Sequence, residues 1–174
     1  MEKKNTHLAY GLITAIIMII VNLVLYITGV IYNPDYKFIS MLGYIPFLIG
    51  IIMNAIAFSK ARDGFVSFGN VFGSCFKATL IIMLVLVVWG TISLFVFPEM
   101  KDKMLEMSRE QMIKNKNMTD DQVDMALNMT KKYWSLFMYI GVIFGTMIFG
   151  AIFSLIGGAI ANKKGEPPMS ATNF

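Results

Sequence analysis

Residue types that carry catalysis are scarce in this chain of 174 residues. It has one cysteine, Cys75, and one histidine, His7, so it offers no Cys/His cluster for zinc and no intrachain disulfide. The sequence also lacks a phosphate-binding loop, a His-Glu-x-x-His metalloprotease motif and a Gly-x-Ser-x-Gly nucleophile elbow. We therefore expect a protein that is not an enzyme and that has no cofactor and no metal.

Methionines have a spacing that could bind a soft metal. Met100, Met104 and Met107 fall on one face of a predicted helix, and thioether sulfurs suit Cu(I). Methionine is also a pliable apolar residue that fills irregular spaces. Because the chain has 15 methionines, the apolar interpretation is favoured.

Two asparagines, Asn22 and Asn54, are the deepest strongly polar residues of the apolar stretches. They could line a substrate path. They could instead form hydrogen bonds between helices, each contributing about 1 kcal/mol or less in a membrane. The structural role is favoured.

Residues 63–77 are predicted to form an amphipathic lead-in to an apolar helix. Aromatic rings recur on one helical face, at Phe65, Phe68, Phe72 and Phe76. Another face carries Gly69, Gly73 and Lys77. We expect the rings to face acyl chains and the glycines to face a protein neighbour. Lys77 either binds an anionic lipid or substrate in a gating element, or only extends to the headgroups, and the second interpretation is favoured.

Small residues also mark the last apolar stretch. Gly141 and Gly145 share one face, and Gly150, Ser154 and Gly157 lie roughly opposite. Small residues let helix backbones approach closely in lipid. We expect this helix to pack on both sides, within the bundle or against another protomer.

The composition requires a membrane environment for these elements. The chain is 56% hydrophobic and 15% charged, with a mean hydropathy of +0.64, whereas soluble domains carry about 45–50% apolar and about 25% charged residues. The sequence predicts an all-α integral membrane protein with four transmembrane helices, at residues 8–32, 38–59, 78–97 and 134–161. Pro46 lies within the second stretch and is expected to kink it.

The polar segment 99–132 is predicted to form a helical hairpin outside the membrane, between the third and fourth spans. Thr119 and Gln122 have the spacing of a capping box, in which each side chain binds the backbone N–H group of the other residue. The second helix is expected to continue into the fourth span. The turn of the hairpin is expected near Lys116–Met118. The C-terminal tail, residues 165–174, is expected to be disordered.

Charge indicates an orientation. An even number of spans places both termini on one side, and the leading Lys3-Lys4 pair favours a cytoplasmic location for that side. The net charge of +4 is interpreted as contact with anionic lipid headgroups. We expect the lipid bilayer as the main partner, a homo-oligomer or a membrane protein as a further one, and no nucleic acid.

The Gly-x-x-Ser-Phe-Gly-x-x-Phe pattern of residues 64–72 resembles a family of small bacterial membrane proteins, domain of unknown function 4199. Tyr10-Gly11, the segment Met118–Gln122 and the run Ser154–Ile160 fit the same resemblance. It implies a four-helix fold in the bacterial cytoplasmic (inner) membrane, and it brings no activity and no site residues.

Two classes of function remain open from the sequence. The first is a structural or accessory membrane protein that acts through protein or lipid contacts. The second is a small oligomeric transporter or channel. Ion-coupled transport usually requires an ionisable residue inside the membrane. Because only Lys77 lies near, at the edge of a span, the first class is favoured.

Overall fold

The computed structural model describes residues 5–32, 41–114, 119–161 and 164. Regular structure within these ranges is entirely helical: α1 (Thr6–Ile27), η1 (Val30–Tyr32), η3 (Met41–Tyr44), α3 (Ile45–Lys60), α4 (Phe68–Val96), α5 (Glu99–Lys114), α6 (Asp120–Lys132) and α7 (Trp134–Ile160). Four helical stretches of the described residues are long and apolar enough to cross a membrane. Three of them are α1, α4 and α7, and the fourth, Leu42–Lys60, joins most of η3 to α3. The prediction of four apolar helices is confirmed.

The first apolar helix is shorter than residues 8–32. It ends at Ile27, and Gly29 follows with φ of +72°, a left-handed conformation that glycine adopts without steric cost. The Gly29 N–H donates to the carbonyl of Tyr26 at 3.0 Å. The chain then turns into η1.

Pro46 begins a helix and does not kink one, so that expectation was wrong. It lies in the first turn of α3, where proline loses no hydrogen bond because the first N–H groups of a helix are unpaired. As a result α3 has only 16 residues, about 24 Å of helix. Residues 33–37, between the first two predicted spans, lie outside the described residues.

Residues 68–77 of the predicted lead-in form one continuous helix, α4, with the third span, whereas residues 63–67, which include Phe65, precede this helix. Ser67 caps it, and its hydroxyl accepts from the Asn70 N–H at 3.2 Å. Asp63 and Gly64, with φ of 52° and 82°, turn the chain before it. At 29 residues α4 is about 43 Å long, more than the ~30 Å of a hydrocarbon core.

The polar segment is helical, as predicted. The Arg109 guanidinium and the Asp124 carboxylate, 3.5 Å apart on the surface, link α5 to α6. Tyr133 interrupts the helix between α6 and α7, with φ of −105° and ψ of 20°, so the expected continuous helix was wrong. The predicted turn at residues 116–118 and the tail 165–174 lie outside the described residues.

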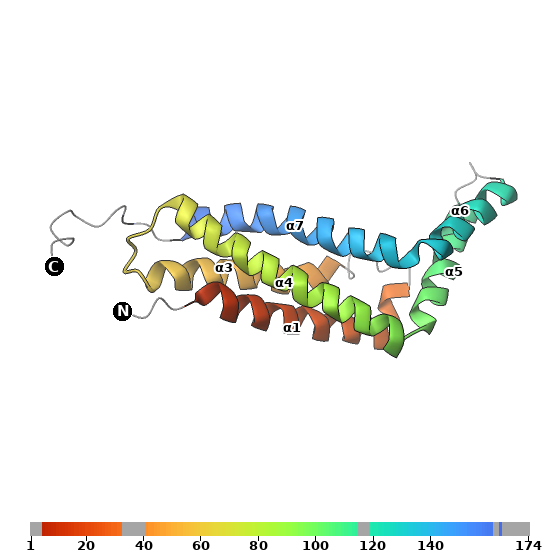
Figure 1. The fold of residues 1–174 in the computed structure, drawn as a ribbon, viewed down its shortest axis with the longest axis horizontal. Coiled ribbons are helices and arrows are strands. Elements are labelled where there is room, and N and C mark those ends of the chain that lie inside the picture. Colours follow the sequence, from red (N-terminus) through yellow and green to blue (C-terminus); the bar gives the residue numbers. More distant parts are fainter. Residues whose placement is uncertain (1–4, 33–40, 115–118, 162–163, 165–174) are drawn as a thin grey trace.

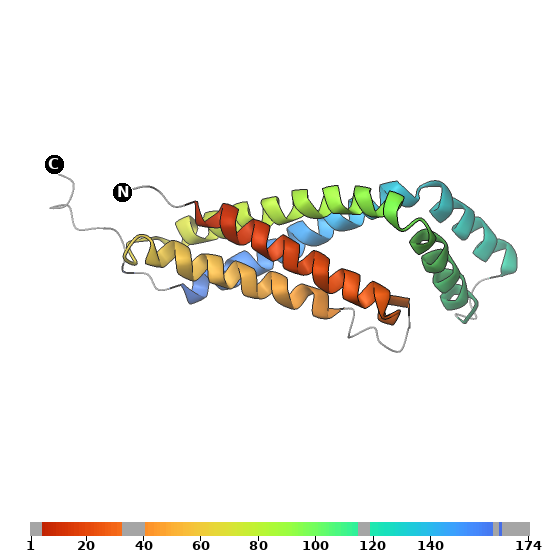
Figure 2. The same ribbon diagram turned by 90° about the horizontal axis from the view of Figure 1, so that it is seen from below.

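The four long helices form a bundle in which α3 and α4 are central. Both helices pack against α1 and α7, and they also pack against each other. Figure 2 shows α1 and α3 diverging from α4 and α7 toward the end that carries η1 and α5. The bundle is therefore closed at one end and wide at the other.

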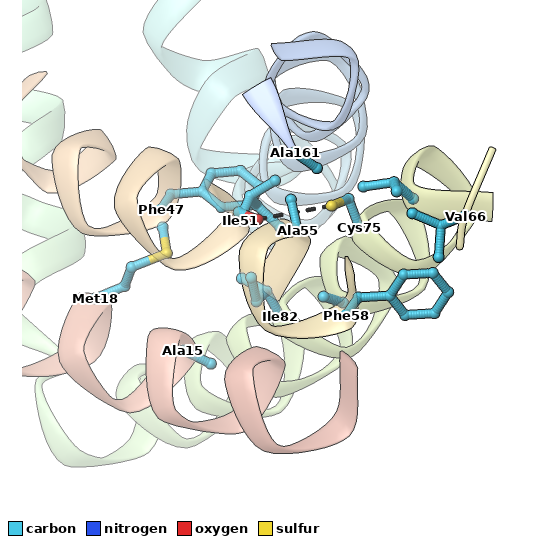
Figure 3. Packing of buried hydrophobic residues seen from close by; sticks show 12 residues of the cluster. Ala15, Met18, Phe47, Ile51, Ala55, Phe58, Val66, Cys75, Ile82 and Ala161 are labelled. Carbon is cyan, nitrogen blue, oxygen red and sulfur yellow. Dashed lines mark hydrogen bonds between the residues drawn. The ribbon is translucent and has the colours of Figure 1, made fainter. Parts of the chain in front are cut away.

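The buried core lies in the closed part of the bundle (Figure 3). It comprises Ala15, Met18, Phe47, Ile51, Ala55, Phe58, Val66, Val71, Cys75, Ala78, Ile82 and Ala161. On α4 the buried residues all lie between Val71 and Ile82, so the second half of this long helix contributes none. Large apolar side chains such as Ile20, Leu84 and Phe95 are exposed on the outside, as expected of a surface that faces lipid.

Two glycine–threonine contacts hold the closed part together. A Cβ atom at Gly50 on α3 would lie 1.9 Å from the Thr14 hydroxyl oxygen on α1. A Cβ atom at Gly150 on α7 would lie 2.1 Å from the Thr79 methyl group on α4. Each pair of helices approaches this closely only because glycine has no side chain.

Candidate functional site: an apolar cavity at the wide end of the bundle

A cavity of about 550 Å³ occupies the wide end of the bundle. Its described walls come from α1, η1, η3, α4, α5 and α7. The lining includes Met18, Asn22, Tyr26, Tyr44, Trp89, Ser93, Phe97, Met100, Met104, Met138, Gly141 and Thr146. The cavity exists because α3 begins only at Ile45, so the other three helices extend beyond it and leave space between them.

The cavity walls are mainly apolar. Met18 and Met138 face it from α1 and α7, and Met100 and Met104 line it from α5. These side chains give the walls flexible thioether groups that adapt to the shape of a ligand. Cavities of about 300–1,000 Å³ with such linings are typical of small-molecule sites.

The polar groups at the cavity are few and neutral. Asn22 donates from Nδ2 to the Met18 carbonyl at 2.9 Å, and Ser93 donates from its hydroxyl to the Gly90 carbonyl at 2.8 Å. The described lining residues include no Asp, Glu, Lys, Arg or His. This lining favours an uncharged apolar ligand, because a charge there would lose its hydration without gaining an ionic partner.

Tyr26 and Glu99 connect the cavity wall to the start of α5. The Tyr26 hydroxyl donates a hydrogen bond to the Glu99 carboxylate. The ring of Tyr26 also packs on Phe97, with centroids 4.9 Å apart. The hydrogen bond from Tyr26, followed by one from the backbone of Glu99 itself, lowers the pKa of the Glu99 carboxyl group. These contacts hold α5 where Met100 and Met104 close part of the cavity.

Comparison with known families identifies the chain. Residues 9–163 match the family model described as "Protein of unknown function (DUF4199)". The chain belongs to this family. The matched residues include the described cavity lining and both polar helices, so the site lies within the DUF4199 domain. No curated protein and no solved structure gives a significant match to the DUF4199 chain.

The two asparagines of the DUF4199 chain have different roles. Asn54 is fully buried, and its Nδ2 lies 3.3 Å from the Ser74 hydroxyl and 3.7 Å from the Cys75 sulfur, so it links α3 to α4. Cys75 in turn donates to the Ile51 carbonyl at 3.6 Å, as the dashed line in Figure 3 shows. Asn22 bonds within its own helix and lines the cavity.

The predicted glycine contacts of α4 are not made within this chain. A Cβ atom at Gly73 would have no atom within 4 Å, and one at Gly69 would approach only the Ser67 hydroxyl, at 3.9 Å. The aromatic face lies closer to a helix, because a Cβ atom at Gly158 on α7 would lie 2.8 Å from the Phe68 ring. Within this chain the glycine face of α4 is therefore open, and its packing against another molecule stays a prediction.

Gly141 and Gly145 are open in the same way, since a Cβ atom at either position would have no atom within 4 Å. Gly141 lines the cavity and Gly145 is not part of its described lining. The opposite face of α7 is packed, with Gly150 on Thr79 and Gly157 near Ala55 and Cys75. Of the two predicted small-residue faces of α7, only the face with Gly150 and Gly157 therefore packs closely against other helices of this chain.

Lys77 is exposed on α4 and is not part of the cavity lining, so the structure does not bring the predicted site residues into one site. The cavity itself was missed, since Trp89, Phe97 and Met138 form no motif. The sequence feature that could have revealed the cavity is the pair Gly29 and Pro46. A helix stop at Gly29 and a helix start at Pro46 shorten the first two spans on the same side of the bundle.

Proposed function

We propose that this protein is a multi-pass membrane protein that binds a lipid-derived acyl chain in the cavity at the wide end of its bundle. The observation that carries the proposal is the apolar, uncharged lining of that cavity, within helices that are themselves apolar on the outside. An apolar space surrounded by bilayer lipid is more favourably filled by hydrocarbon than by water.

The residue types of the lining support a flexible ligand. Gly90 and Gly141 leave room along α4 and α7, and methionines approach from three helices. An acyl chain bends with little energetic cost and fits such an adaptable surface. Neutral groups such as Asn22 and Ser93 are sufficient for the ester or hydroxyl end of a lipid.

A structural or accessory role without catalysis fits this site best. Ion-coupled transport usually depends on an ionisable side chain inside the membrane, and the described cavity lining supplies none. We place the protein in the bacterial cytoplasmic membrane with its termini inside. The described cations near that end, which include Lys60, Arg62 and Lys77, support this orientation.

The proposal can be tested by fluorescence quenching of Trp89, which lines the cavity. The protein carrying Trp134→Phe, which leaves Trp89 as the single tryptophan, is titrated in detergent with the methyl ester of a dibrominated fatty acid, which carries no charge. We expect saturable quenching. Gly141→Phe should abolish it, because the new ring enters the cavity without meeting another atom close to its Cβ.

Gly145→Phe is the matched control, one helical turn away and equally open but outside the described lining. It should preserve the saturable phase. Quenching that rises linearly with the concentration of the fatty-acid ester, or that is equal in the two phenylalanine variants, would show that Trp89 meets only bulk detergent and lipid. The proposed function would then be wrong.

A further inference from the structure

A second, smaller pocket lies at the opposite end of the bundle, where α3 and α7 end. It has a volume of about 280 Å³ and is lined by Ile56, Ser59, Lys60, Asp63, Gly64 and Lys164. It shares no described lining residue with the apolar cavity. Two lysines from segments far apart in the sequence meet at this pocket.

Lys164 is held in place by the turn before α4. Its backbone N–H donates to the Gly64 carbonyl at 2.7 Å. Its side chain crosses Gly64 so closely that a Cβ atom there would lie 3.1 Å from Lys164 Cγ. The Lys164 ammonium also lies 5.9 Å from the centroid of the Phe65 ring. This lysine is therefore positioned before any ligand arrives.

The pocket has polar and apolar parts at different depths. Lys60 is the last residue of α3, and Ile56 lies one helical turn deeper in the span with half of its side chain exposed. If α3 and α7 cross the bilayer, Lys60 and Lys164 lie at the headgroup level and Ile56 lies at the first carbons of the acyl chains. The charged lining residues are the two lysines and Asp63, so the lining carries a net charge of +1. This charge suits an anion with a single negative charge.

We propose that this pocket binds the phosphate group of a phospholipid, with Lys60 and Lys164 as the contacts to the phosphate oxygens and Ile56 against the acyl chain. A phosphodiester carries one negative charge and forms charge-assisted hydrogen bonds with ammonium groups. The inference rests on the proposal that the helices span a membrane, and it does not depend on the cavity.

The test is native mass spectrometry of the full chain in detergent. Phosphatidylglycerol is titrated alongside diacylglycerol, which lacks the phosphate, and glycerophosphoglycerol, which keeps the phosphodiester and lacks the chains. We expect phosphatidylglycerol to bind and the other two to bind far more weakly. Lys60→Gln with Lys164→Gln should weaken phosphatidylglycerol binding about 30-fold, since each lysine near a lipid surface contributes about 1 kcal/mol.

Two control proteins make the outcome decisive. Lys101→Gln with Lys131→Gln removes the same charge from α5 and α6 and should leave binding unchanged, and Lys60→Arg with Lys164→Arg should retain it. Equal loss in the α5–α6 variant would reduce the effect to net charge and overturn the site. Equal binding of glycerophosphoglycerol would overturn the lipid as the source of the phosphate.

The cavity variant Gly141→Phe separates the two proposals, because it should leave phosphatidylglycerol binding unchanged. If it removes that binding, the lipid occupies the cavity and the pocket at Lys60 and Lys164 is not its site. If it removes only fatty-acid binding, the two sites are independent. A failure of the fatty-acid experiment alone leaves the phosphate site standing.

Discussion

At the residue scale, glycines decide how closely the helices pack, but only where a side chain faces them. Gly150 faces the β-branched side chain of Thr79, whose Cβ atom would lie 2.9 Å from an added Cβ. Threonine has few rotamers in a helix and cannot turn away without cost. Gly73 has open space instead. We therefore expect glycine to be required at Gly150 on α7 and replaceable at Gly73 on α4.

Leucine substitutions at these two glycines should differ in their effect on stability. Gly150→Leu should lower the free energy of unfolding by at least about 1–3 kcal/mol, the usual cost of overpacking. Gly73→Leu should leave it unchanged or raise it, because leucine is a better helix former than glycine, which is roughly 0.8–1.0 kcal/mol less favourable than alanine in a helix interior. Thermal unfolding in detergent measures both. A Gly73→Leu variant as unstable as Gly150→Leu would mean that α4 has a close neighbour on its open face.

Glu99 gives a pH dependence that can be traced to one hydrogen bond. Its pKa is lowered in the folded protein, chiefly by the Tyr26 hydroxyl, so the ionised carboxylate is the form that the fold stabilises. That stabilisation is complete above the ordinary glutamate pKa of about 4.3 and is lost as the pH falls through the lowered value. Acid should therefore loosen the start of α5 from the cavity wall.

Tyr26→Phe tests this link directly. It removes the largest cause of the shift, so the pKa of Glu99 should return toward its ordinary value. An NMR titration of the Glu99 carboxyl carbon measures the change, and Tyr32→Phe is a suitable control because it leaves the hydrogen bond in place. An unchanged Glu99 pKa in Tyr26→Phe would show that the bond is absent in solution.

At the scale of elements, the start of α6 depends on its capping residues. The backbone N–H of Thr119 donates to the Gln122 side-chain oxygen at 3.0 Å, as the sequence predicts. Gln122→Ala removes this hydrogen bond and should weaken the first turn of α6 by roughly 0.5–1.5 kcal/mol, the usual net contribution of one hydrogen bond. Faster hydrogen exchange of its first amides would report the loss, and Gln111→Ala, an exposed site within α5, should leave them unchanged. Equal exchange in both variants would contradict the capping role.

At the scale of the whole molecule, charge is distributed unevenly between the two ends. The described end near the termini carries Lys60, Arg62, Lys77 and Lys164 against one described acid, Asp63. On α5 the acids and bases are interspersed, and on α6 the acids near its start are followed by Lys131 and Lys132 at its end, so positive and negative charges nearly balance there. Positive residues favour the cytoplasmic side of a membrane. Together with the Lys3-Lys4 pair in front of the first span, which usually dominates orientation, this positive end predicts cytoplasmic termini.

Reporter fusions check this orientation. A phosphatase that folds only outside the cytoplasm should be inactive after Lys164 and active after Lys114. A fluorescent protein that folds only inside should give the reverse result. Phosphatase activity after Lys164 would place the termini and the phosphate pocket on the outer side.

The sequence by itself determined the number and approximate position of the apolar helices. Each depends on a local run of residues long enough to cross a bilayer, and α7 at Trp134–Ile160 agrees with the predicted residues 134–161 within one residue. It also determined that the polar segment is helical and that Thr119 and Gln122 begin α6. Local hydropathy and capping chemistry are sufficient for these features.

Only the tertiary structure decided which helical faces meet and where the bundle opens. In a membrane protein the buried and lipid-facing side chains are both apolar, so the sequence shows no polar stripe that fixes the rotation of a helix. Gly73 and Gly150 therefore look alike in the sequence, yet only Gly150 touches a neighbour. The cavity depends on where α3 begins relative to α1, α4 and α7, and that alignment is set by packing between helices and not by any one of them.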